Sequence, residues 1–308
     1  MSRGPVVVLG SVNADLMLRC PQLPVPGETV HGRDFHTVPG GKGANQAVAA
    51  ARLGASVGFI GCVGDDEFGR SARRLLAAEG IDTEHLHCTG AATTGVAMIL
   101  VDDAGQNCIA LAAGANAALS IAHVDGAKAM IQRAALLICQ LECPLPVMAH
   151  GIALAHAANV PVLLNPAPMQ VLPPELLAQV DVLVPNETEA AALLGLAPGA
   201  HFDAAVAAKR LRGSGPRTVI VTLGARGVQL ASDGIDRHLA APVVRAIDTT
   251  GAGDTFIGAY AAAWCEGATV TEAIDVAQRA AAISVTKAGA IAAMPRRSEL
   301  MLSMSGRA

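Results

Sequence analysis

An aspartate stands among small residues in the segment DTTGAGDTFIG, which covers residues 248–258. Gly251, Ala252 and Gly253 come directly before Asp254, and the apolar run that follows is helical in character. The three small residues would therefore lie in the first turn of a helix, where free N–H groups can bind an anion. An acid beside such a turn suits a general base that deprotonates a hydroxyl while the amides hold a phosphoryl group. The alternative is an ordinary helix start with Asp254 placed favourably on the dipole, although two glycines there weaken a helix.

Two other segments combine polar residues with small or extended surroundings. In GGKGANQAVAAARLGA (40–55), Lys42 and Asn45 stand one helical turn apart among residues too small to bury them, so they can face one cleft. A flexible loop with packing glycines is the alternative for this segment. In GSVNAD, the side chains of Asn13 and Asp15 point to one face of an extended chain, which suits neighbouring hydroxyls or is simply a polar strand exit.

Three further polar positions follow apolar strand-like runs. Asn186 and Glu189, in PNETE, fit a helix N-cap with an acid at the third helical position. Glu142 ends the run ALLICQLE, where it faces either a crevice or solvent. The segment TLGARG (222–227) predicts a hairpin, with backbone contact to a nucleotide as the functional alternative.

The common nucleotide and metal motifs are absent. Gly41-Lys42 is followed by glycine rather than by serine or threonine, so there is no P-loop, and no GxGxxG follows a strand. The nine histidines show neither HxxxH nor HExxH spacing. A phosphate site in this chain must therefore rest on other backbone geometry.

The elements that position these residues follow from the alternation of apolar β-type runs with Ala-rich helical runs. This rhythm predicts an α/β fold with a doubly wound, mostly parallel sheet flanked by helices. Buried strands are expected at 6–10, 57–64, 135–142, 160–166, 180–186 and 217–224, and helices at 43–53, 66–79, 120–133, 145–158, 187–194 and 203–213.

Two stretches interrupt that alternation. Residues 15–38 contain prolines and short alternating segments, and residues 95–111 predict a hairpin around Asp103 to Gly105. Together they are expected to form a small antiparallel β-sheet, a lid inserted in a single domain of residues 1–308. A lid of this kind would cover a site at the strand ends.

Composition excludes several classes of protein. Hydrophobic residues make up 52% of the 308 residues and aromatics only 2%, so the core must be built from Ala, Val, Leu and Ile. The net charge of −4 leaves no basic footprint for nucleic acid, and no apolar run approaches the roughly 18 residues of a membrane span. Seven scattered cysteines without a CxxC pair argue against a disulfide framework and favour the cytoplasm.

Taken in order along the chain, these segments resemble the signature segments of the ribokinase family of sugar kinases. The resemblance runs from residue 10 to about residue 290 and includes GSVNAD, PVPGETV, GGKGANQAVAAARLGA, GDDEFG, GANAALS, NPAP, PNETEA, TLGARG and DTTGAGDTF. It implies a ribokinase-like fold and transfer of the γ-phosphoryl group of ATP to the 5-hydroxyl of D-ribose, giving D-ribose 5-phosphate and ADP.

The resemblance also implies a role for each matched residue. Asp254 is implied as the catalytic base, and the amides of Gly251, Ala252 and Gly253 as the anion hole. The positions that match sugar contacts are Asn13, Asp15, Gly41, Lys42, Asn45 and Glu142, with Asp254 itself. The positions that match nucleotide contacts are Asn186, Thr222, Gly224, Gly227, Gly253 and Gln278.

Cations and a partner chain are implied in the same way. Glu189 matches the residue that organises Mg²⁺ and phosphate through water. Family members use a monovalent cation, typically K⁺, and the matching positions are Asp248, Thr250, Ser284, Lys287, Gly289 and Ala293. The residues IAAM at 291–294 depart from the usual pattern of that loop. The lid sheet is expected to pair with its twin in a homodimer.

Two alternatives remain open at this point. One is a related kinase of the same family that acts on deoxyribose, fructose or a nucleoside such as adenosine. The other is a non-catalytic sugar-sensing protein on the same fold, against which the intact Asp254 and its glycines weigh.

Overall fold

A nine-stranded sheet forms the body of the molecule in the computed structural model, which describes residues 4–197 and 200–305. Its strand order is β13-β12-β11-β10-β9-β8-β1-β4-β5, and the strands from β11 to β5 are parallel. The strands are β1 (Val6–Leu9), β4 (Val57–Gly64), β5 (Asp82–Thr89), β8 (Leu136–Cys139), β9 (Val162–Leu164), β10 (Val182–Leu183), β11 (Thr218–Thr222), β12 (Val228–Ser232) and β13 (Ile235–Leu239). The predicted mostly parallel sheet is confirmed, and β12 and β13 extend it as antiparallel strands.

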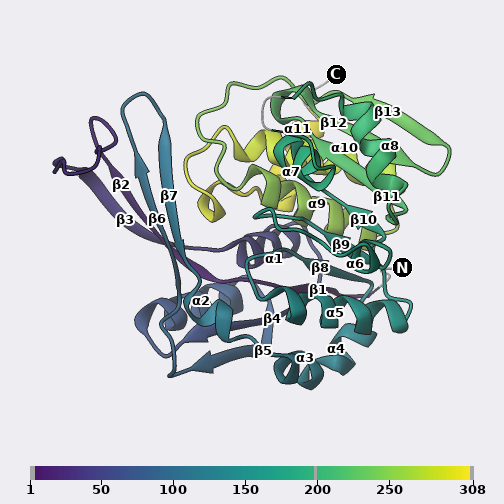
Figure 1. Cartoon of the computed structure of the whole chain (residues 1–308), viewed down its shortest axis with the longest axis horizontal. Helices are drawn as coiled ribbons and strands as arrows, with labels where there is room; N and C mark the ends of the chain where they lie inside the picture. The colour runs from purple at the N-terminus through teal and green to yellow at the C-terminus, as the bar shows by residue number, and fades with distance from the viewer. Residues whose placement is uncertain (1–3, 198–199, 306–308) are drawn as a thin grey trace.

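Helices cover both faces of this sheet (Figure 1). They are α1 (Lys42–Arg52), α2 (Glu67–Ala78), α3 (Ile121–Gly126), α4 (Lys128–Gln132), α5 (Leu145–Ala157), α6 (Pro174–Leu177), α7 (Glu187–Leu193), α8 (Ala204–Arg212), α9 (Ala252–Cys265), α10 (Val270–Ser284) and α11 (Arg297–Ser305). The helix expected over 120–133 divides into α3 and α4 at Ala127, directly after Gly126, a residue type that weakens a helix.

The strand β1 shows how the core divides into two layers. Its residues Val6 and Val8 face the layer that contains α1, α2, α9 and α10, whereas Val7 and Leu9 face the layer that contains α3, α5 and α8. All four side chains are fully buried, as expected for a central strand covered on both sides.

The strand order reverses between β1 and β8. From β1 the chain first builds outward through β4 and β5, and it then returns to the other side of β1 to build β8 to β11. In such sheets the crevice outside the carboxyl ends of the strands, at the point of reversal, is where ligands bind. The segments after Leu9 and after Cys139 therefore flank the expected crevice.

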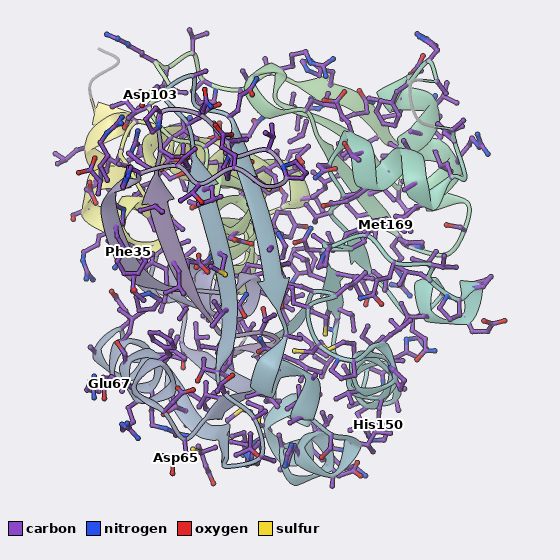
Figure 2. All side chains as sticks on the ribbon, turned by 60° about the vertical axis from the view of Figure 1, so that its left-hand side comes forward. Phe35, Asp65, Glu67, Asp103, His150 and Met169 are labelled. Atoms are coloured by element: carbon purple, nitrogen blue, oxygen red, sulfur yellow. The ribbon has the colours of Figure 1, made fainter. Side chains whose placement is uncertain are left out.

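A small four-stranded sheet extends from this body (Figure 1). Its strands are β2 (Asn13–Arg19), β3 (Arg33–Gly40), β6 (Gly95–Val101) and β7 (Asn107–Ala112), in the order β3-β2-β6-β7. The pairs β2–β3 and β6–β7 are antiparallel, and they join through a parallel pairing of β2 with β6. Figure 2 shows Asp103 at the tip of the β6–β7 hairpin, where the sequence predicts a turn, and Phe35 on the edge strand β3.

Small residues bring α1 and α9 into close contact. A Cβ atom added to Gly258 of α9 would lie 2.5 Å from Ala49 Cβ and 2.6 Å from the carbonyl oxygen of Gln46, both in α1. Such distances exclude any side chain unless one helix moves. Gly258 lies one helical turn after Asp254, so this contact also sets how close Asp254 comes to α1.

Replacing Gly258 by alanine is expected to destabilise the fold by about 1–3 kcal/mol, because the added methyl group overpacks the α1–α9 contact. Urea unfolding followed by circular dichroism measures the change. Gly126→Ala is the matched control, since an added Cβ there meets no atom within 4 Å and alanine favours the helix. Equal unfolding free energies for the two variants would contradict the packing argument.

Candidate active site

The carboxyl end of β1 is tied to the segment that follows β8. The Ser11 hydroxyl donates to Glu142 Oε2 at 2.5 Å, and the backbone N–H of Lys42 donates to the same oxygen at 3.1 Å. Glu142 is therefore held at the point of strand reversal by hydrogen bonds from the exit of β1 and the start of α1.

Two glycines allow α1 to begin against the exit of β1. Gly41 has φ of 90°, and a Cβ there would lie 2.7 Å from the backbone nitrogen of Asn13. A Cβ on Gly43 would lie 2.6 Å from the backbone nitrogen of Ser11. The glycines of GGKGAN are thus required by close backbone contact, and this contact brings Lys42 to the crevice.

Asp254 is buried in the first turn of α9, with 7% of its surface exposed. Its Oδ2 accepts a hydrogen bond from Asn45 Nδ2, and its Oδ1 accepts one from Gln46 Nε2, each at 2.9 Å. No basic residue stands near Asp254 in the sequence, and the fold supplies these two neutral amides from α1 instead. The carboxylate is held by both oxygens in a fixed orientation.

Asn13 and Asp15, at the start of β2, lie on the crevice side of the small sheet. Asn13 Oδ1 accepts from Asn116 Nδ2 at 2.8 Å, and Asn116 also bonds the backbone of Val12. Asp15 is 9% exposed, and its carboxyl group packs over Gly40, where a Cβ would lie 2.2 Å from Asp15 Oδ2. Burial, reinforced by the negative charges of Glu142 and Asp254, raises the pKa of Asp15 to about 7.

Lys42 balances these acids. Burial alone would lower the pKa of its ammonium group, but surrounding carboxylates outweigh burial and raise that pKa. The carboxylates belong to Asp254, Glu142, Glu189 and Asp15. One cation thus stands within the electrostatic reach of four acids, and the crevice is strongly negative without a ligand.

The first turn of α9 is built for close approach. Gly251 has φ of 72°, in the left-handed region, and a Cβ there would lie 3.0 Å from Ala290 Cβ. By contrast, a Cβ on Gly253 would meet no atom within 4 Å, because that side of Gly253 faces open space. The Ala252 N–H donates to the Thr249 carbonyl at 3.2 Å, whereas the amides of Gly251, Gly253 and Asp254 make no hydrogen bond to any residue that the structure describes.

A cavity of ≈ 320 Å³ opens beside this turn. Apolar side chains such as Val228 and Phe256 line it. The expected nucleotide positions among its lining residues are Thr222, Gly224, Gly227, Gly253 and Gln278. The hairpin expected at TLGARG is confirmed, since β11 and β12 pair across a short 3₁₀ turn at Gly224–Arg226.

Asn186 and Glu189 lie next to this cavity. Asn186 bridges to Thr222, a cavity residue, across the ends of β10 and β11. The predicted capping box is present: the Glu189 N–H donates to Asn186 Oδ1 at 2.8 Å, and the Asn186 N–H donates to Glu189 Oε2 at 2.9 Å. Burial raises the pKa of Glu189 against the hydrogen bond from Asn186 and the charge of Lys42, which lower it.

The loop before α9 meets the segment after α10. Asp248 Oδ1 accepts from the Thr250 backbone at 2.9 Å and from its hydroxyl at 2.6 Å, and Asp248 Oδ2 accepts from the Gly289 N–H at 2.8 Å. Burial opposes ionisation, but these hydrogen bonds hold the pKa of Asp248 below its usual value. Asp248, Thr250 and Gly289 are thus brought together.

The other three expected cation positions lie along the same segment. Ser284 is the last residue of α10, Ala293 lies in a 3₁₀ turn at Ile291–Ala293, and the Lys287 ammonium pairs with Glu299. No group of three or more His, Cys, Asp or Glu residues with metal-binding geometry occurs within residues 4–197 and 200–305.

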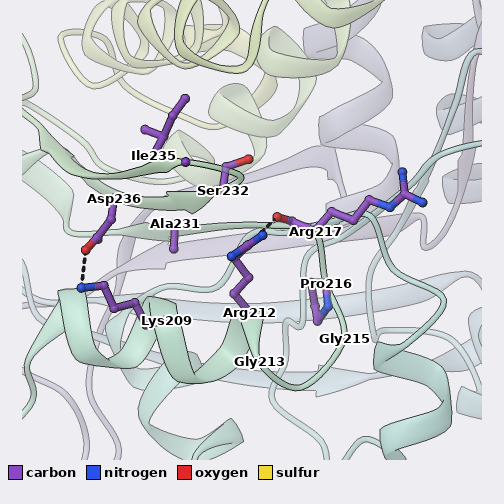
Figure 3. A pocket seen from close by; sticks show the side chains of 11 residues that line it. Lys209, Arg212, Gly213, Gly215, Pro216, Arg217, Ala231, Ser232, Ile235 and Asp236 are labelled. Atoms are coloured by element: carbon purple, nitrogen blue, oxygen red, sulfur yellow. Dashed lines mark hydrogen bonds and ion pairs between the residues drawn. The ribbon is translucent and has the colours of Figure 1, made fainter.

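A separate hollow of ≈ 550 Å³ lies between α8 and the strands β12 and β13 (Figure 3). Lys209 and Arg212 line it and are neutralised by ion pairs with Asp236 and Asp233. None of the sequence-predicted site residues lines this hollow, which lies at the opposite end of β11 from Thr222. Several of the predicted residues line the smaller cavity instead.

The sequence predictions missed several buried polar residues that bond to the predicted site residues directly or through Gln46. They are Ser11, Gln46, Asn116, Gln140 and Asn165. Their sequence context could have identified them, because each is a polar residue inside or directly after a run of apolar or small residues. Asn116 and Asn165 also belong to the segments GANAALS and NPAP, to which no role is assigned above.

With this geometry established, a family model described as "pfkB family carbohydrate kinase" matches residues 4–297. This chain belongs to the pfkB family of carbohydrate kinases. The ribokinase of Haemophilus influenzae is 45% identical over 97% of this chain and 98% of its own length. A solved structure of Arabidopsis thaliana ribokinase, complexed with ribose and ATP, matches with a TM-score of 0.89 at 33% identity, covering 98% of both chains. A deoxyribokinase of Salmonella typhi is 36% identical over 94% of this chain and 95% of its own length.

The family confirms the resemblance, the fold class and the enzyme class predicted from the sequence. The chain is a carbohydrate kinase with a ribokinase-like α/β fold, and ATP is its co-substrate. Across the described part of the chain, no helix has the length and apolar character needed to span a bilayer.

The burial of Asp15 predicts a pH-dependent stability. The folded-state pKa of about 7 lies above the ordinary value of 3.8, so between these values the folded chain binds more protons than the unfolded chain, and its stability falls as pH rises. Asp15→Asn removes that dependence. The difference in unfolding free energy, taken as the variant minus the unsubstituted protein, should increase by about 2–3 kcal/mol from pH 5 to pH 8.

Urea unfolding at the two pH values measures this difference. Asp65→Asn is the control, because Asp65 is exposed and forms only a surface ion pair with Arg70, which contributes little to stability. A pH-independent difference for Asp15→Asn would contradict the electrostatic description of the crevice.

Proposed function

We propose that this kinase transfers the γ-phosphoryl group of ATP to the 5-hydroxyl of D-ribose, giving D-ribose 5-phosphate and ADP. The observation that carries the proposal is the orientation of Asp254. Its buried carboxylate lies in the first turn of α9 and is held by two side-chain amides of α1. The free N–H groups of the same turn of α9 border the adjacent cavity. A base and an anion site are thus adjacent, which is what in-line phosphoryl transfer to a hydroxyl requires.

In this mechanism Asp254 takes the proton of the sugar hydroxyl as the oxygen attacks the γ-phosphorus. The bond from the γ-phosphorus to the bridging oxygen of ATP breaks, and ADP leaves. The amides of Gly251 and Gly253 donate to the transferring phosphoryl oxygens, and Lys42 adds a positive charge to the crevice. The Ala252 amide joins them only after it releases the Thr249 carbonyl.

The sugar is proposed to bind between the small sheet and α1. Asn13, Asp15, Gly41, Lys42, Asn45 and Glu142 are the proposed contacts. Asn45 supports this directly, because its Oδ1 is buried and has no hydrogen-bond partner within the described residues. A buried acceptor without a partner is unfavourable, and a sugar hydroxyl would satisfy it. Asp15, with a pKa of about 7, is suited either to donate to or to accept from a hydroxyl.

The adenine nucleotide is proposed to occupy the cavity of ≈ 320 Å³. Thr222, Gly224, Gly227 and Gln278 would contact it, and Asn186 would contact its phosphates. The apolar lining by Val228 and Phe256 suits a purine ring. Gly253 borders the same cavity, so the γ-phosphate would reach the helix N-terminus.

Two cations fit the residues present. Glu189 would organise Mg²⁺ through water, since Mg²⁺ is usually bound by one or two carboxylates together with substrate phosphates. Asp248, Thr250 and the backbone of Ser284, Lys287, Gly289 and Ala293 would hold K⁺, for which an oxygen-only set of a carboxylate and carbonyls is suitable. Bound cations would supply positive charge that offsets the net charge of −4. Unchanged turnover without Mg²⁺, or with K⁺ replaced by a bulky ammonium ion, would contradict the respective site.

We also propose that residues 1–308 form one catalytic domain, with 15–38 and 95–111 as a lid that pairs with its twin in a homodimer. Asp15, Ala97 and Leu111 are register partners and therefore share one face of the small sheet. On that face Ile109 is 53% exposed and Leu111 is 54% exposed, which favours coverage by a second copy. Sedimentation that found only monomers at micromolar concentration, or scattering curves unchanged by ribose, would count against the dimer and against lid closure.

A cytoplasmic location is the proposal that suits the cysteines. Seven are free in the described chain, and five of them are buried. A reducing compartment keeps such thiols unpaired. Recovery of the native protein from a periplasmic or secreted fraction would contradict this location.

A panel of acceptors tests the proposed substrate. With ATP, Mg²⁺ and K⁺, kcat/KM for D-ribose should exceed that for 2-deoxyribose by at least about 10-fold, because buried polar groups built for a missing hydroxyl stay unpaired. Release of ADP measures the rate for each sugar and for adenosine. Preference for deoxyribose, fructose or adenosine would establish the related-kinase alternative, whereas sugar binding without any ADP release would revive the sensor alternative.

Replacing the base tests the proposed chemistry. Asp254→Asn should lower kcat by at least about 10²-fold while sugar and ATP binding are largely kept, because the amide preserves size but cannot accept the proton. Steady-state kinetics and calorimetric binding measure the two effects. Near-normal turnover of this variant would disprove the assignment of the base.

A further inference from the structure

Gln46 contacts the carboxylate of Asp254 from the protein interior. Its surface is fully buried, and its Nε2 donates to Asp254 Oδ1 at 2.9 Å. Asn45 donates to the other oxygen of Asp254 but retains a buried acceptor without a partner. Gln46 is therefore the contact of Asp254 that sugar binding leaves in place.

A backbone carbonyl sets the orientation of the Gln46 amide. The Val184 carbonyl can only accept, so Asn165 turns its Nδ2 toward it, at 3.0 Å. This leaves Asn165 Oδ1 as an acceptor, toward which Gln46 turns its Nε2 at 3.3 Å. The second N–H of that Nε2 is then directed at Asp254, so the carboxylate meets a donor rather than an acceptor.

A second contact supports the same orientation. Gln140 Nε2 donates to Gln46 Oε1 at 2.7 Å, which fixes the carbonyl end of the Gln46 amide. Gln140, Asn165 and Val184 each come directly after a strand, namely β8, β9 and β10. Three adjacent parallel strands thus anchor the amide, and rigid strand ends hold it more precisely than a loop would.

We propose that Gln46 is a positioning residue for the kinase reaction: it fixes the orientation of the Asp254 carboxylate for proton abstraction. This role rests on the proposed function, in which Asp254 is the base. The donor to Oδ1 fixes the plane of the carboxylate, so Asp254 stays oriented toward the proton that it accepts. Because Gln46 is buried behind Asp254, it acts on the chemical step and not on substrate binding.

The variant Gln46→Met tests this role, since methionine has a similar length and no hydrogen-bonding amide. We expect kcat to fall about 10- to 100-fold, as for a misplaced catalytic group, while KM for sugar and ATP changes less than about 3-fold. A fall in kcat with both KM values kept distinguishes lost orientation of the base from lost substrate binding.

Gln229→Met is the matched control. Gln229 is also buried, and it donates to Asp236 on the strand β13, outside the crevice. This variant loses a buried amide in the same way, and its kcat and KM values should stay unchanged. If Gln46→Met does not fold, Asn165→Leu replaces it, because Asn165 orients Gln46 without contacting Asp254. A smaller fall in kcat with both KM values kept is then expected.

The outcomes separate this proposal from the proposed substrate. If the unsubstituted protein prefers another acceptor, the same kinetics are measured on that acceptor, and the role of Gln46 stands or falls on its own. A folded Gln46→Met with kcat unchanged, or with an effect on KM alone, would overturn it. A full loss of activity in Asp254→Asn with no effect in Gln46→Met would do so as well.

Discussion

The contact between the Asp254 carboxylate and two amides of α1 is the interaction on which the site depends. It joins the start of a helix near the C-terminal end of the chain to a helix near the N-terminal end, more than 200 residues away in sequence. The close approach at Gly258 makes this contact possible, because any side chain there would separate the two helices. The packing of two small-residue helices therefore sets the position of the group that is proposed to do the chemistry.

The electrostatics of the crevice follow from the same packing. The charges of four carboxylates act on Lys42, and among the described residues the hydrogen bonds to the Asp254 carboxylate come from two neutral amides. A chain with net charge −4 thus presents its substrates with few basic side chains. The proposed phosphate site therefore relies on a helix N-terminus and on the proposed cations, and the free amides at the start of α9 support this proposal.

Much of the fold could be predicted from the sequence, because the alternation of apolar strands and Ala-rich helices is regular. The strand at 57–64 and the capping box of Asn186 and Glu189 are determined by neighbouring residues in the sequence, and both are present. Gln46 could not be predicted in this way. Its partners Asn165 and Asp254 lie 119 and 208 residues away, and only the finished sheet brings them together. The strand β13, which is mostly exposed, likewise carries no apolar pattern that marks it.

The reversal of strand order between β1 and β8 has a consequence for how this enzyme can change. Apart from Asp254, the proposed acceptor contacts, from Asn13 to Glu142, come from the first half of the chain, and the proposed nucleotide contacts, from Asn186 to Gln278, all come from the second. The two selectivities are encoded in separate stretches of the gene. Exchange of the first stretch between relatives would alter the acceptor while the phosphoryl donor stays the same. In such a hybrid protein the two parts would meet at the contact between α1 and α9. The glycine and alanine residues of one helix would have to pack against those of the other.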